Sequence, residues 1–168
     1  MFCNQCEQAA KGTGCTKIGV CGKDETTAGL QDFLIHAAQG LALYAMAGRR
    51  VGIVDEEVNR FTCEAVFSTL TNVNFDDERF ATLVHKAVDL RQDLKEKIAA
   101  QGGDIEFSEP AANFTPAADI ATLAQQGEAL HFLQNPDEDP DITSLKQVLL
   151  YGLKGVAAYA DHAKILGR

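Results

Sequence analysis

The sequence predicts an all-α protein: an up-down helical bundle preceded by a cysteine-rich loop, with the first helix of a second, incomplete bundle at its end. Three observations support this fold class. Apolar residues recur at helical spacing in several long segments, acidic residues precede them as helix N-caps, and four of the five cysteines lie within the first 21 residues. A length of 168 residues suits one domain with its own core.

Residues 1–23 form the predicted cysteine loop. Cys3, Cys6, Cys15 and Cys21 follow the pattern C-x2-C-x8-C-x5-C. Thiolates this close repel one another unless they bind a soft metal or form disulfides. Structural zinc sites usually use two short C-x-x-C pairs, and only the first pair is present here. An iron–sulfur cubane accepts wider spacing, so it is the favoured interpretation; zinc and disulfide or redox chemistry remain alternatives.

The composition excludes several other classes of protein. Met1 is not followed by the basic and apolar segments of an export signal, so we expect a reducing cytoplasm, where clustered cysteines more often bind metal. No run of apolar residues predicts a membrane span. The formal net charge of −9 argues against nucleic-acid binding. The isolated Cys63 is expected to pack in a helix rather than to bind metal.

Residues 24–103 form the predicted three-helix bundle. Asp24, Asp55 and Asp76 are suited to cap three successive helices, and each segment that follows carries one apolar stripe. The third helix is expected to stop at Gly102-Gly103. Because the links are short, neighbouring helices should run in opposite directions, as in an up-down-up bundle.

Residues 104–140 are predicted to be a connector with a short helix. Thr115-Pro116 resembles a helix start with proline at the first position, and Asn135-Pro136 resembles its end. Glu128 and His131 have the spacing of half a di-iron site, but no second copy of the pair exists, so we expect no such site.

Residues 141–168 are predicted to be one helix, opened by Asp139-Pro140. Its pattern repeats that of the first helix at a constant offset: Leu30, Leu34, Gly40, Ala42, Tyr44 and Ala45 correspond to Leu145, Leu149, Gly155, Ala157, Tyr159 and Ala160. A repeat indicates a structural unit used twice, although small residues at helix crossings can also match by chance. We therefore expect the opening helix of a second bundle, whose apolar residues either pack back on the first bundle or mediate self-association.

Several stretches closely resemble the N-terminal part of the hybrid-cluster (prismane) proteins, known as hydroxylamine reductases. The resemblance covers nearly the whole chain and is most specific in two places. The first is the cysteine loop, with Met1-Phe-Cys-Asn-Gln-Cys-Glu-Gln, Gly-Thr-Gly-Cys15 and Gly-Val-Cys21-Gly-Lys. The second is the Thr69–Asp76 part of Phe67-Ser-Thr-Leu-Thr-Asn-Val-Asn-Phe-Asp76.

The resemblance implies a cofactor and an activity. It implies that Cys3, Cys6, Cys15 and Cys21 hold a [4Fe-4S] cluster, and that a redox partner protein donates electrons. The family reduces hydroxylamine to ammonia, with proposed roles in nitrosative stress, at a second, hybrid 4Fe-2O-2S cluster whose Cys, Glu and His ligands lie in later domains. None of those ligands can be placed on this sequence. We therefore expect an electron-entry domain that is inactive alone; the alternative is a stand-alone helical Fe–S module that transfers electrons or senses redox state.

Overall fold

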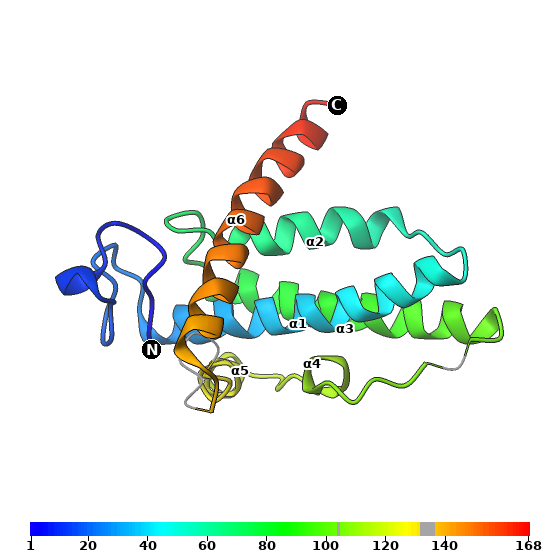
Figure 1. Cartoon of the computed structure of the whole chain (residues 1–168), viewed down its shortest axis with the longest axis horizontal. Helices are drawn as coiled ribbons and strands as arrows, with labels where there is room; N and C mark the ends of the chain where they lie inside the picture. Colours follow the sequence, from blue (N-terminus) through cyan, green and yellow to red (C-terminus); the bar gives the residue numbers. More distant parts are fainter. Residues whose placement is uncertain (104, 132–136) are drawn as a thin grey trace.

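A computed structural model describes residues 1–103, 105–131 and 137–168. The described part of the chain contains six α-helices, one 3-10 turn and no strand, which confirms the predicted all-α class. Figure 1 shows the N-terminal loop at one end of a group of helices, with the last helix crossing that group steeply.

The central helix is α1 (Glu25–Arg50), and the other elements pack around it. α3 (Asp77–Ala100) and α5 (Ile120–Glu128) make the most extensive contacts with it, and α2 (Glu56–Ser68) and the one-turn α4 (Pro110–Asn113) contact it less extensively. Leu30, Leu34 and Leu41 of α1 are fully buried in this core, together with Phe61 and Phe80. The segment predicted as a connector therefore contributes helices to the core.

Helix N-caps explain where the long helices begin. Asp24 accepts a hydrogen bond from the Thr27 amide at 2.8 Å, and Asp76 accepts one from the Arg79 amide at 3.0 Å. Asp55 caps α2 in the same way. A side-chain acceptor at this position satisfies an amide that has no partner within the helix, so the three predicted caps are confirmed.

The predicted helix start at Thr115-Pro116 is wrong. α5 begins at Ile120, because Asp119 caps it by accepting a hydrogen bond from the Thr122 amide at 2.9 Å. The Gln126 side chain binds the Thr115 carbonyl and the Ala117 amide, which holds the preceding segment outside the helix. α5 ends at Glu128; the predicted end at Asn135-Pro136 lies outside the described residues.

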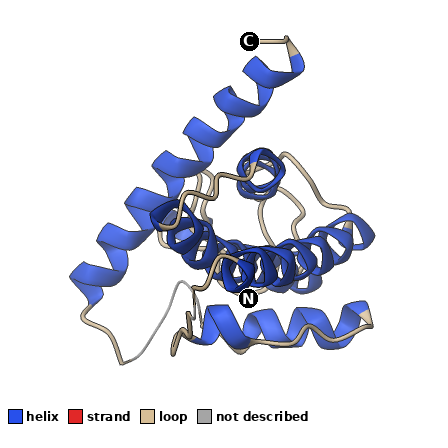
Figure 2. Ribbon diagram, turned by 90° about the vertical axis from the view of Figure 1, so that its right-hand side faces the viewer, coloured by secondary structure: helices blue, strands red, loops and turns tan. Residues whose placement is uncertain are grey.

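The last helix, α6 (Pro140–Ile165), starts as predicted, with Asp139 as its N-cap and Pro140 at its first position. It packs across α2, and its C-terminal half projects beyond the other helices (Figures 1 and 2). Lys154 and Ala157 are buried on its packed side. No helix in the described ranges is long and apolar enough to cross a lipid bilayer.

The two copies of the repeated sequence pattern, in α1 and α6, differ in burial. Leu30 and Tyr44 of α1 are 0% and 3% exposed, whereas their counterparts Leu145 and Tyr159 of α6 are 66% and 81% exposed. The exposed apolar side chains of α6 include Leu145, Val148, Leu149, Leu153, Val156 and Tyr159, and we call these six residues the α6 face. The same pattern is thus buried in one helix and uncovered in the other.

We expect the 168-residue chain to self-associate through the α6 face, because contiguous exposed apolar surface drives association. Val156→Glu should shift the protein toward monomer in size-exclusion chromatography with light scattering. Lys164→Glu, at an exposed polar position of the same helix, should leave the distribution unchanged. A monomer at all concentrations, with unimpaired folding after deletion of residues 141–168, would contradict this expectation.

Candidate metal centre

Backbone hydrogen bonds bring the cysteine loop back on itself. Cys3 and Cys15 pair in an antiparallel bridge, with the Cys3 amide 3.0 Å from the Cys15 carbonyl and the Cys15 amide 2.8 Å from the Cys3 carbonyl. Gly19 donates to the Lys23 carbonyl at 2.7 Å, which closes a turn around Cys21. Gly22 in this turn has φ +91°, a conformation that favours glycine.

The loop places Cys3, Cys6, Cys15 and Cys21 around one pocket. All four thiols are free, as is Cys63, which lies on α2 and is not among the residues that line the pocket. Within the described residues, no group of three or more Cys, His, Asp or Glu side chains is arranged to hold a metal ion. The four sulfurs thus share one pocket without being gathered around a single point.

Part of the pocket wall comes from the turn between α2 and α3. Leu70, Thr71, Asn72 and Phe75 line the pocket together with the cysteines. These residues belong to the second stretch that carried the family resemblance. The tertiary structure therefore brings the two most specific stretches of the sequence to the same place.

Local polar groups favour the thiolate form of Cys15. The backbone amides of Val20 and Ala10 lower the pKa of Cys15, burial opposes them, and Lys23 adds to the lowering. Thiolates, rather than thiols, bind metal ions. The lowered pKa of Cys15 therefore favours its role as a metal ligand.

Two lysines are buried beside the loop. Lys23 is 6% exposed, and its Nζ donates to Gln31 Oε1 at 2.9 Å. Lys154 of α6 is 5% exposed, and its Nζ donates to the Thr69 carbonyl at 3.0 Å and to Gln5 Oε1 at 3.1 Å. Burial and, to a smaller extent, the nearby Lys23 lower the pKa of Lys154 to about 8, although Asp32 and Cys3 act in the opposite direction.

These two ammonium groups donate hydrogen bonds to uncharged oxygens. In the described part of the chain, neither Lys23 nor Lys154 forms an ion pair, and their acceptors are neutral oxygens. Burying an unpaired charge is costly. An anionic group bound among the four thiolates would offset that cost, so the chemistry of the surroundings fits an anionic iron–sulfur cluster.

Asp32 lies near both lysines. Burial raises the pKa of this carboxyl group to about 7, although Lys23, Lys154 and the N-terminal ammonium act in the opposite direction. Since the unfolded pKa is near 4, the folded protein retains the proton between about pH 4 and pH 7. Ionisation of Asp32 therefore costs stability as the pH rises through this window.

We expect Asp32→Asn to stabilise the iron-free protein at pH 8 by about 2 kcal/mol, since asparagine cannot ionise. At pH 4, where the aspartate is protonated, the free energy of unfolding should hardly change. Urea unfolding at both pH values measures the difference. Asp89→Asn, at an exposed position of α3, is the matched control. Equal effects of the two substitutions at pH 8 would refute the explanation.

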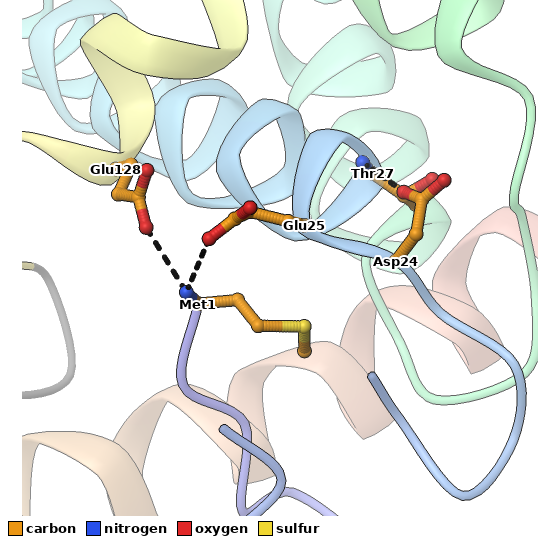
Figure 3. A network of polar contacts seen from close by, with 5 residues as sticks. All are labelled: Met1, Asp24, Glu25, Thr27 and Glu128. Carbon is orange, nitrogen blue, oxygen red and sulfur yellow. Dashed lines mark hydrogen bonds and ion pairs between the residues drawn. The ribbon is translucent and has the colours of Figure 1, made fainter. Parts of the chain in front are cut away.

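The N-terminal ammonium anchors the start of the loop. Figure 3 shows it between two helix ends, 3.0 Å from Glu128 Oε1 of α5 and 3.3 Å from Glu25 Oε1 of α1. The hydrogen bonds to Glu128 and Glu25 raise the pKa of the ammonium group, with burial opposing them. Glu128 thus has a structural role that its spacing from His131 did not indicate.

Sequence reasoning identified the cysteines but missed the polar groups around them. Lys23 stands in the cysteine loop with Lys11 and Lys17, so the sequence shows its positive charge but not its burial. Lys154 lies far along the chain, and no local pattern links it to the loop. A lysine among the apolar residues of the last helix was the signal that could have pointed to a buried charge there.

Comparison with known proteins gives the family of the chain. A family model described as the prismane/CO dehydrogenase family matches residues 1–168. The chain belongs to this family. The finding confirms the resemblance inferred from the cysteine loop and the Thr69–Asp76 stretch.

Curated relatives are much longer than this chain. The hydroxylamine reductase of Syntrophobacter fumaroxidans is 57% identical over 168 residues, which are the whole of this chain and 31% of that protein. The hydroxylamine reductases of Methanocella arvoryzae and Maridesulfovibrio salexigens are 49% and 50% identical over the whole chain, and the match covers 31% and 30% of them. The chain spans about a third of the length of these relatives.

Proposed function

We propose that this chain is the N-terminal, [4Fe-4S]-binding and electron-transferring part of a hydroxylamine-reductase-type oxidoreductase. Cys3, Cys6, Cys15 and Cys21 are its proposed ligands. The observation that carries the proposal is that these four cysteines line one pocket, beside two buried lysines that form no ion pair with any residue the structure describes. Membership of the family and the names of its relatives agree with it.

When bound, the cluster would supply one-electron transfer. The residues of this chain have separate tasks around it. The amides of Val20 and Ala10 favour the Cys15 thiolate, and Lys23 and Lys154 balance negative charge. The backbone bridge between Cys3 and Cys15 fixes the distance between two halves of the loop. These groups suit the site to an anionic centre, around which the four sulfurs would have to come together.

The activity proposed for the whole protein is the reduction of hydroxylamine to ammonia. By family resemblance this reaction takes place at a hybrid cluster held by residues beyond this chain. A redox partner protein would deliver electrons to the [4Fe-4S] cluster, which would pass them on. We place the protein in the cytoplasm, where reducing conditions keep the cysteines available as ligands.

Metal analysis of anaerobically purified protein tests the cofactor. We expect about four irons and about four acid-labile sulfides per chain, with broad visible absorption. Zinc without sulfide would refute the iron–sulfur assignment. A comparison of hydroxylamine reduction by a full-length relative and by this chain tests the role: we expect turnover only for the longer protein. Iron–sulfur binding without turnover in a full-length protein would favour the stand-alone electron-transfer or sensing module.

A further inference from the structure

A row of polar side chains along one side of α6, its polar stripe, contacts the cysteine loop. Gln147, Tyr151 and Lys154 are spaced i, i+4 and i+7, so they lie on one side of the helix. Gln147 Oε1 accepts a hydrogen bond from Asn4 at 2.8 Å, the Tyr151 hydroxyl donates to Asn4 Oδ1, and Lys154 donates to Gln5 at 3.1 Å.

Asn4 and Gln5 are the two residues between Cys3 and Cys6. We call them the knuckle. Its two side chains are thus held through three hydrogen bonds by a helix more than 140 residues away in the sequence. Because the knuckle connects two proposed ligands, these hydrogen bonds link α6 to the positions of Cys3 and Cys6.

Lys154 also joins α6 to the other wall of the pocket. Its Nζ binds the carbonyl of Thr69, the residue after the last turn of α2, where the helix dipole is negative. Thr69 is fully buried and directly precedes the pocket-lining Leu70 and Thr71. One buried ammonium group therefore bridges the knuckle and the α2–α3 turn.

A buried cation beside an iron–sulfur cluster affects its reduction. Four thiolates on a cubane leave a net anion, and reduction adds one more negative charge. A nearby ammonium group stabilises the reduced form more than the oxidised form, and low local polarity strengthens the effect. In the described residues Lys154 has no ion-pair partner, although Asp32 lies near enough to attract it and Lys23 near enough to repel it.

We propose that α6 is a positioning element of the cluster site: its polar stripe holds the knuckle between Cys3 and Cys6, and the Lys154 ammonium raises the reduction potential of the cluster. The proposal rests on the proposed function for its electrostatic part. Its positioning part concerns contacts that exist in the protein without iron.

Redox titration of the anaerobically purified 168-residue protein tests the electrostatic part. Lys154→Met should lower the midpoint potential of the cluster by about 59 mV. For a one-electron couple, this shift lowers the ratio of reduced to oxidised cluster about tenfold at a fixed potential. Lys164→Met removes the same charge from an exposed position of α6 and should leave the potential unchanged. Equal potentials in the two variants would overturn the electrostatic role.

Alkylation of the iron-free protein tests the positioning part. Tyr151→Phe removes the hydroxyl bond to Asn4 and keeps the charge of Lys154. We expect both Tyr151→Phe and Lys154→Met to speed the reaction of Cys3 and Cys6 with iodoacetamide several-fold, with no change at Cys63. Circular dichroism checks that each variant is folded. Rates equal to those of Lys164→Met would overturn the positioning role.

The two measurements separate the possible failures. A wild-type protein that never binds iron would refute the proposed function and, with it, the electrostatic role of Lys154. The alkylation rates would then still decide whether α6 positions the knuckle. A cluster with the expected iron content but equal potentials would leave the proposed function standing and remove only the electrostatic role.

Discussion

Cys15→Ser is expected to abolish cluster binding, reducing iron from about four to less than about one per chain. Cys15 is the most buried of the five cysteines, and its backbone pairs with that of Cys3. Serine is a poor ligand for iron in this setting, so three thiolates would remain for four irons. Iron and sulfide analysis, with the visible spectrum of protein purified under argon, measures the loss.

Cys63→Ser is the matched control for this substitution. Cys63 is also a free, partly buried cysteine, but it lies on α2 and is not among the residues lining the pocket. We expect it to retain full iron content. Equal loss in both variants would show that the effect reflects folding rather than ligation, and equal retention would remove Cys15 from the ligand set.

A second large effect is expected for Gly40→Ala, which should lower the free energy of unfolding by about 3 kcal/mol. Gly40 lies on α1 where the backbone of α4 approaches closely. A Cβ atom at this position would lie 1.8 Å from the Ala111 carbonyl oxygen, far inside contact distance. Because the obstacle is backbone rather than a flexible side chain, α4 would have to move away. Urea unfolding of the iron-free protein measures the change in the free energy of unfolding.

The repeat supplies the control for this prediction. Gly155 of α6 is the counterpart of Gly40, and a Cβ atom there meets nothing within 4 Å. Gly155→Ala should therefore be neutral or stabilising by about 0.5–1 kcal/mol, since alanine favours helix more than glycine does. Destabilisation of the same size in both variants would contradict the close approach of α4 to α1.

Helix starts were predictable because their causes are local. Asp24, Asp55 and Asp76 each accept a hydrogen bond from an amide two or three residues away, so the pattern is contained in a few neighbouring residues. One predicted helix start was wrong because a distant residue overrides the local pattern. Thr115-Pro116 has a local helix-start pattern, yet Gln126, nine or more residues away, holds that segment outside α5.

The sequence by itself determined the helical class, the family resemblance and the four cysteines as a candidate cluster loop, because spacing and periodicity depend on neighbours along the chain. Only the tertiary structure showed that Lys154 and Tyr151 meet the knuckle, and that Glu128 meets the N-terminal ammonium. It also decided that one repeat pattern is buried in α1 and exposed in α6. Burial and pairing of charges depend on which distant segments pack together, and no local pattern specifies that.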